Sequence, residues 1–121
     1  MKFVKQQNEK DCAVACLYNI IRYHKGYVDM DKLRVKLKTN KDGTSVYDIV
    51  KVSNEIGFQS DAYECELNNL IDVKLPIIAH IKLNNIYDHF VIVYKIVDYD
   101  VYIFDPIRGY IKLQMEEFEN T

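Results

Sequence analysis

The hydrophobic residues of this chain recur with two different periods, one in each half of the sequence. In the first half they return every three to four positions, which is the period of a helix with one buried face. We expect three helices there, over residues 12–24, over 29–37, and from a cap at Thr44 or Ser45 to residue 56. A strand over residues 58–64 and a turn or short helix over 67–73 are expected to follow.

The second half is rich in β-branched and aromatic residues, in short runs separated by turn-forming residues. We expect four strands there, over residues 76–83, 88–96, 101–104 and 110–113, and a last helix over 115–119. Helices that come before an antiparallel sheet define the α+β class. The 121 residues suit one domain, so residues 1–121 are expected to form a single unit without repeats or linkers.

The composition argues against several classes of function. The formal net charge of −2 gives no overall basic footprint, so no nucleic-acid partner is expected. The three cysteines, Cys12, Cys16 and Cys65, are odd in number and lack CxxC spacing, which argues against a disulfide framework and a zinc site. Free thiols suggest a reducing, cytosolic setting. The polar N-terminus and the lack of an apolar run of about 20 residues predict neither a signal peptide nor a membrane span.

Candidate chemistry begins where the first predicted helix starts, in the stretch QQNEKDCAVACL. Asp11 is expected to be its N-cap, with a carboxylate that accepts from the free amides of the first turn. Cys12 then lies on that turn, where the helix N-terminus favours an anion such as a thiolate. Gln6, in the polar stretch upstream, is placed to fold back as an oxyanion donor. The alternative is that Cys12 is a small, inert core residue.

A candidate base and its partner lie on a predicted hairpin. His89 opens the strand over residues 88–96, and Asp105 ends the strand that follows. A simple hairpin would place the two on one face, because their separation is even. A carboxylate on one imidazole nitrogen leaves the other free as a base. Alternatively, Asp105 only opens a turn with Pro106 and His89 is an ordinary strand-edge residue. We interpret the remaining histidines and cysteines as structural: His24, His80, Cys16 and Cys65.

The order of these residues resembles a known family. Gln6 comes six residues before Cys12, which follows Asp11, and His89 and Asp105 lie far downstream, sixteen residues apart. The chain is similar to the bacteriocin-processing cysteine peptidases, the papain-like N-terminal domains of ABC transporters that cut double-glycine leader peptides. The resemblance covers nearly the whole chain, in the motifs DCxxAC, GTSVYDIVKVSNEIGF, LPIIAHI, HFVIVYKI and FDPIRG.

The resemblance implies a papain-like fold with four site residues. Cys12 would be the nucleophile, His89 the general base and acid, and Asp105 the residue that orients the histidine. Gln6 would complete the oxyanion hole beside the backbone amide of Cys12. One departure is Ala13, where the family usually has glycine. We expect its methyl group to narrow the groove or to shift the amide slightly.

The resemblance also implies a reaction and its setting. The reaction is acyl transfer at the second glycine of the leader peptide of a bacteriocin, lantibiotic or peptide-pheromone precursor, coupled to export. No cofactor is expected, and ATP belongs to a transport module that is absent from this chain. The expected partners are the leader peptide and the transmembrane and nucleotide-binding domains of an ABC transporter. Such a domain lies on the cytoplasmic side of the plasma (inner) membrane, whereas a freestanding peptidase is soluble in the cytosol.

Two other functions stay open on the residues alone. The first is a leader-docking module of the same fold with little or no proteolysis, which the presence of Cys12 disfavours. The second is a thiol redox or acyl-transfer protein that uses Cys12 and Cys16. A disulfide between residues four apart in one helix is geometrically awkward, because their Cβ atoms are too far apart.

Overall fold

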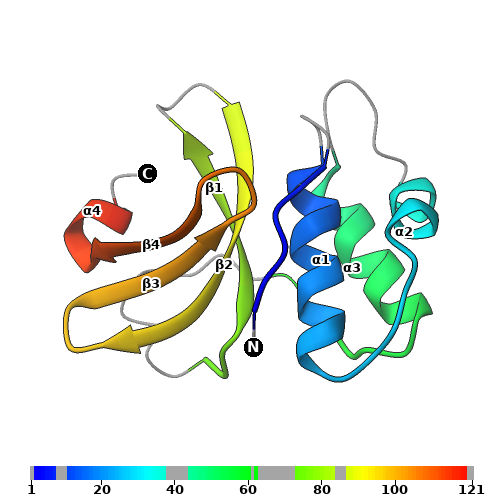
Figure 1. Ribbon diagram of the computed structural model, residues 1–121, viewed down its shortest axis with the longest axis horizontal. Coiled ribbons are helices and arrows are strands. Elements are labelled where there is room, and N and C mark those ends of the chain that lie inside the picture. The colour runs from blue at the N-terminus through cyan, green and yellow to red at the C-terminus, as the bar shows by residue number, and fades with distance from the viewer. Residues whose placement is uncertain are drawn as a thin grey trace.

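The sheet of this molecule lies between a short helix and a group of longer ones (Figure 1). A computed structural model describes residues 2–7, 11–37, 44–60, 62, 73–83 and 87–119. Its elements are α1 (Cys12–Tyr23), α2 (Met30–Lys36), α3 (Val46–Glu55), β1 (Ile77–Leu83), β2 (Tyr87–Val97), β3 (Asp100–Asp105), β4 (Gly109–Gln114) and α4 (Met115–Glu119). Helices α1, α2 and α3 lie on one side of the sheet and α4 on the other, which confirms the expected α+β class.

The sheet is an antiparallel meander with the strand order β1-β2-β3-β4. A tight turn joins β2 to β3, and its first residue, Asp98, has a left-handed φ of 53°. Next to this turn Val97 faces Asp100, but farther along Ile92 faces Phe104, so a β-bulge shifts the register by one residue. Side chains alternate between faces, so this shift changes which residues of β2 and β3 share a face.

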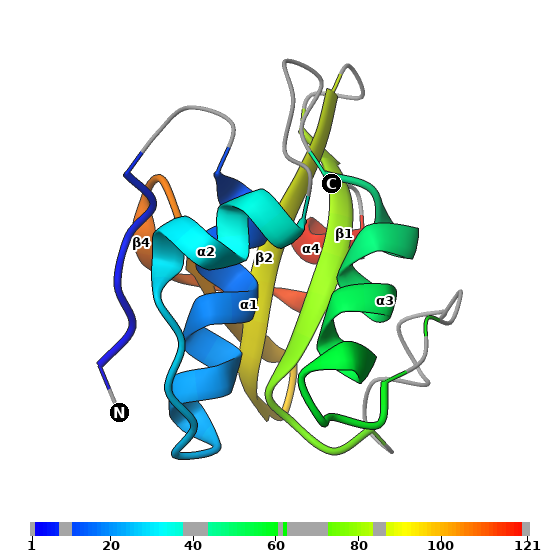
Figure 2. The same cartoon turned by 90° about the vertical axis from the view of Figure 1, so that its right-hand side faces the viewer.

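Helix α1 occupies the centre of the larger core. The residues at its start, 13–17, are all buried, and the helix packs between the sheet and helices α2 and α3 (Figure 2). The sheet residues Phe90, Ile92 and Phe104 belong to this core. A second core on the opposite face joins the sheet to α4, and its buried members are Val91, Val93, Val101, Ile103 and Phe118. Both faces of β2 are therefore buried, which explains its nearly continuous apolar sequence.

The observed bounds agree with the predicted helices and strands to within one residue at each end, with one exception. The strand expected over residues 58–64 is wrong where the structure describes it, because residues 58–60 form no strand. The Ser60 N–H instead donates to Asn54 Oδ1 at 2.9 Å and folds this segment back on α3. The element expected over 67–73 lies outside the described residues, apart from residue 73. In the described ranges, no helix has the length and apolar character needed to cross a bilayer.

Candidate active site

Cys12 lies on the first turn of α1, as expected, and its side chain is partly exposed. The prediction that the Asp11 carboxylate accepts a capping hydrogen bond is wrong, because it accepts none from the amides of the first turn. Side-chain caps need an extended backbone: Ser45 has a ψ of 160° and accepts from the Asp48 N–H, whereas Asp11 has a ψ of 14°. The Asp11 carboxylate instead accepts from Arg34 of α2, from Nη2 at 2.6 Å and from Nε at 3.0 Å to each oxygen.

His89 and Asp105 are both buried and contact each other, with 3.0 Å between Nε2 and Oδ1. The same carboxylate oxygen accepts from the N–H groups of Ile107 at 2.8 Å and Arg108 at 3.3 Å. The other oxygen accepts from Arg108 Nε at 2.9 Å. Asp105 is thus fixed by its own turn, and its contact holds the imidazole in one orientation.

The bulge in β2 brings these two side chains to one face of the sheet. Beyond the bulge Ile92 faces Phe104, so the ladder places Asp105 opposite Val91, two residues from His89. His89 and Val91 share a face because side chains alternate along a strand. The register next to the turn would instead place Asp105 opposite Ile92, on the other face. The expected contact is present, but it is a diagonal contact across a bulged hairpin and not a directly opposite pair.

The charges of the site depend on a balance between burial and pairing. Burial works to lower the pKa of His89, but hydrogen bonds with Asp105 and with the Cys12 thiol outweigh it and raise that pKa from 6.5 to about 9. Burial works to raise the pKa of Asp105, but bonds from His89, the Ile107 N–H and Arg108 hold it well below its usual range. Since Asp105 occupies Nε2, the nitrogen that remains for Cys12 is Nδ1.

Gln6 reaches the site on an extended segment, residues 2–7, which we call the strap. Its backbone N–H donates to Pro106 O at 2.9 Å, directly after Asp105 in the sequence. Its side-chain oxygen, Oε1, is buried. The strap is therefore bound to the same turn that fixes the orienting carboxylate.

The sequence analysis missed three residues that hold parts of the site in place. Arg34 binds Asp11, Arg108 binds Asp105, and Asn19 binds the backbone of Val4 in the strap. Arg108 had a usable signal, because a residue three positions after a turn-opening Asp105 can reach back to its carboxylate. Arg34 and Asn19 had none. The helical pattern shows only that they lie off the apolar stripe, and it says nothing about the partner that each one meets in another element.

The positions of Cys16, His24 and His80 are compatible with the structural role expected for them. Cys16 is fully buried, and burial raises the pKa of its thiol well above the ordinary value. Cys65 lies outside the described residues. His24 is exposed after the end of α1, and His80 stacks on the Phe90 ring with centroids 4.6 Å apart.

Ala13 replaces the glycine that usually follows the cysteine in the resembling family. The residue is fully buried and belongs to the core around α1. The expected narrowing of a groove is therefore wrong, because the methyl group adds to the core and does not face an open surface. The alternative, a slight shift of the backbone amide, stays a prediction.

The fold and the site together define a class of protein. A partly exposed thiol, an imidazole and a buried carboxylate follow one another where the start of α1 meets the sheet. This order suits nucleophilic acyl transfer. Among the residues that the structure describes, no three His, Cys, Asp or Glu side chains gather as metal ligands. A cysteine on the leading helix beside a histidine on the sheet is the architecture of a papain-like cysteine peptidase.

The chain belongs to the Peptidase C39 family, whose model matches residues 1–121. It is 37% identical over 119 residues to the lactococcin-G-processing and transport ATP-binding protein LagD of Lactococcus lactis subsp. lactis, which covers 97% of this chain and 17% of that protein. It is 34% identical over 128 residues to the transport/processing ATP-binding protein ComA of Streptococcus pneumoniae, which covers 98% of this chain and 18% of ComA. The chain thus spans less than a fifth of the length of these relatives.

Solved structures of the same kind share the fold. A double glycine motif protease from an AMS/PCAT transporter, in complex with the leader peptide, has a TM-score of 0.89 and 28% identity over 98% of this chain and 82% of that one. The peptidase domain of Streptococcus ComA has a TM-score of 0.90 and 26% identity over 98% of this chain and 90% of that one. These findings confirm the family and the fold that the motifs predicted.

Proposed function

We propose that this chain is a cysteine endopeptidase that cuts leader peptides after a double-glycine motif, in the precursors of bacteriocins, lantibiotics or peptide pheromones. The observation that carries the proposal is the chain of contacts from the Cys12 thiol through His89 to Asp105. Similarity to a double glycine motif protease supports the choice of substrate.

The proposed reaction has two steps. The Cys12 thiolate attacks the carbonyl carbon of the second glycine, while Gln6 and the Cys12 backbone N–H stabilise the oxyanion. Protonated His89 gives its proton to the leaving amine, the C–N bond breaks and a thioester forms. His89 then takes a proton from water as the water oxygen attacks the thioester carbonyl. The C–S bond breaks, which releases the leader with a new carboxyl group and restores the Cys12 thiolate beside protonated His89. Asp105 keeps the imidazole oriented throughout.

This chemistry is hydrolysis, and we propose that it needs no cofactor. The proposed partners are a leader peptide and the transmembrane and nucleotide-binding domains of an ABC transporter, since LagD and ComA are transport and ATP-binding proteins. ATP would act in those other domains. The site would then work on the cytoplasmic side of the plasma (inner) membrane, coupled to export.

The test is mass spectrometry of the chain mixed with a panel of synthetic double-glycine leaders, with Cys12→Ala and Cys16→Ala as a matched pair. We expect a cut after the second glycine, and loss of turnover by several orders of magnitude in Cys12→Ala with leader binding retained. Cys16→Ala makes the same change one helical turn away and should keep turnover. Binding without any cut in the unaltered chain would favour the docking module, and turnover of Cys12→Ala within about tenfold would exclude Cys12 as the nucleophile.

A further inference from the structure

Asn19 is a buried polar side chain that no step of the proposed reaction uses. It lies on α1, about two turns after Cys12, and is 1% exposed. Its Oδ1 accepts from the Val4 N–H at 2.8 Å, and its Nδ2 donates to Val4 O and to Ala15 O, both at 2.8 Å. One amide therefore binds both backbone groups of a single strap residue and is itself tied to the helix backbone.

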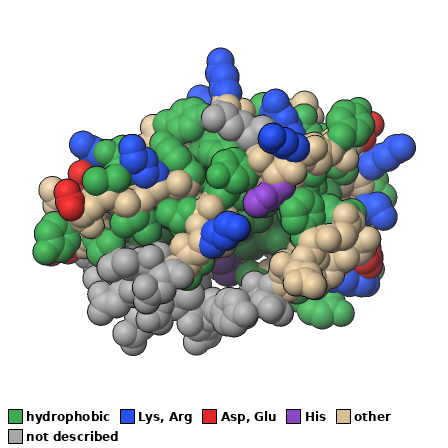
Figure 3. Space-filling model, turned by 90° about the horizontal axis from the view of Figure 1, so that it is seen from below, with side chains coloured by type: hydrophobic (Ala, Val, Ile, Leu, Met, Phe, Trp, Pro, Cys, Tyr) green, Lys and Arg blue, Asp and Glu red, His purple; other side chains and the backbone are tan. Residues whose placement is uncertain are grey.

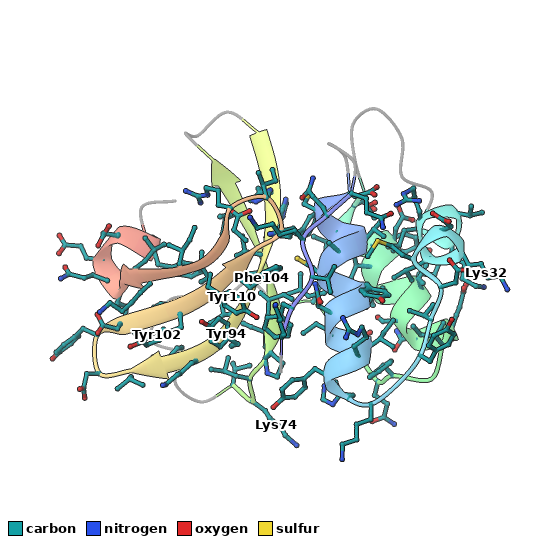
Figure 4. The ribbon with its side chains drawn as sticks, in the orientation of Figure 1. Lys32, Lys74, Tyr94, Tyr102, Phe104 and Tyr110 are labelled. Atoms are coloured by element: carbon teal, nitrogen blue, oxygen red, sulfur yellow. The ribbon has the colours of Figure 1, made fainter. Side chains whose placement is uncertain are left out.

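We call the hydrogen bonds between Asn19 and Val4 the clamp. The strap is also held before and after Val4, by contacts of Phe3 and Gln6. The Phe3 ring packs among Tyr94, Phe104 and Tyr110, with ring centroids 5.9, 5.4 and 6.1 Å away, and the Phe3 backbone N–H donates to the Tyr110 hydroxyl at 2.7 Å. Figure 4 shows Tyr94, Phe104 and Tyr110 close together on the sheet. On the other side the Gln6 N–H is bound to the turn between β3 and β4. Those two contacts fix the strap to the sheet, whereas Asn19 fixes it to α1.

We propose that Asn19 is a positioning residue for the oxyanion hole, which it assembles by clamping the strap to the helix of the nucleophile. Cys12 and Asn19 share one rigid helix, and Val4 is two residues from Gln6. The clamp therefore sets the distance between the two oxyanion donors, the Gln6 amide and the Cys12 N–H. Such donors must be held within about 0.5 Å of the productive geometry to be effective. This proposal deepens the proposed function and rests on it.

The first test compares Asn19→Leu, which keeps the approximate volume without the hydrogen bonds, with Asn54→Leu. Asn54 lies on α3 and serves as an exposed control, since its amide likewise binds both backbone groups of one residue, Ser60. We expect Asn19→Leu to lower kcat by roughly tenfold or more, with KM nearly unchanged, because loss of a whole donor costs about 100-fold or more. Alkylation of Cys12 by iodoacetamide should keep its rate, because that substitution forms no oxyanion. Asn54→Leu should change neither quantity.

A second test uses non-additivity and a milder variant. In Gln6→Ala, the clamp has no donor left to place, so adding Asn19→Leu should cost little further kcat. Tyr110→Phe removes only the hydroxyl that holds the Phe3 N–H and should lower kcat in the same direction, by less.

Some outcomes would overturn the clamp. Losses that multiply in the double variant, or alkylation slowed as much as turnover, would mean that Asn19 is merely structural. Full turnover in both Asn19→Leu and Tyr110→Phe would exclude the clamp while the proposed function stands. If the unaltered chain cuts no leader, the proposed function is wrong and the clamp is wrong with it.

Discussion

At the scale of single residues, His89 and Asp105 are two buried groups that keep their charges by pairing. Their side chains are 2% and 1% exposed. Burial alone favours the neutral form of each. The contact between them reverses this effect, so the pKa of His89 rises to about 9 and that of Asp105 falls well below its usual range. Both are therefore charged at neutral pH, and the imidazolium holds a proton that it can give to a leaving group.

The first prediction concerns Asp105→Asn. The raised pKa of His89 means that its proton, and the stabilising contact that depends on it, are fully present below about pH 6.5 and are lost as the pH rises through about 9. Asparagine carries no charge to hold that proton, so the pKa of His89 should fall. We expect the alkaline limb of the kcat/KM profile to move to lower pH.

The same series ranks the residues. His89→Ala should lower kcat about as much as Cys12→Ala does. Asp105→Asn should lower kcat less, because the Asp105 side chain contacts only the histidine and not the bond that breaks. An alkaline limb that stays in place, or an Asp105→Asn variant less active than His89→Ala, would contradict the assigned roles.

Cys12, His89 and Asp105 could be predicted from the sequence because each one has a local signal. Cys12 follows the polar stretch at a helix start, and His89 and Asp105 lie at strand ends on one hairpin. Asn19 and Arg34 could not be predicted, because their partners are in other elements and the helical period carries no information about them.

At the scale of elements, the hairpin of β2 and β3 shows the limit of the sequence pattern. Strand bounds followed from the apolar runs, but the bulge between Val93 and Lys95 has no such signal. A one-residue shift exchanges the faces of a strand. In the register beside the turn, where Val97 faces Asp100, residues an even number apart lie on opposite faces of the hairpin. His89 and Asp105 share a face only because the bulge shifts that register by one residue.

The second prediction belongs to this scale and concerns the ion pair that joins α2 to the start of α1. Asp11 is 1% exposed and Arg34 23%, and Arg34 Nη1 also donates to Asp31 Oδ1 at 2.6 Å. Removing one partner of a buried pair leaves an uncompensated charge. Arg34→Met should therefore lower the free energy of unfolding in urea by about 3 kcal/mol, and adding Asp11→Asn should recover part of it.

The control for this pair is Lys32→Met, which removes a cation from an exposed position of the same helix. It should change the free energy of unfolding by less than about 0.5 kcal/mol. Equal losses in Arg34→Met and Lys32→Met would show that the ion pair contributes nothing beyond surface charge.

At the scale of the whole molecule, the site is assembled from three parts that are far apart in the sequence: the strap, the start of α1, and the strands β2 and β3. They meet between the helices and the sheet (Figure 1). Another view of the surface shows hydrophobic side chains exposed among basic ones (Figure 3). Among the described residues, the large hydrophobic side chains that are well exposed include Tyr27, Val35 and Tyr47. The chain thus has apolar surface with which a partner could make contact outside the reacting centre.

The last prediction concerns how the proposed substrate is selected. A bond after Gly-Gly offers no side chain for a pocket to bind, so selection there depends on excluding a Cβ. Many flexible loops contain Gly-Gly, so affinity must come from farther along the leader, where an amphipathic helix can lay its apolar residues on the domain. Replacing either leader glycine with valine should chiefly lower kcat, whereas replacing the apolar helix residues with alanine should chiefly raise KM. Steady-state kinetics on a series of synthetic leaders measures both effects. A short Gly-Gly peptide cut as efficiently as the full leader would show that no remote contact is used.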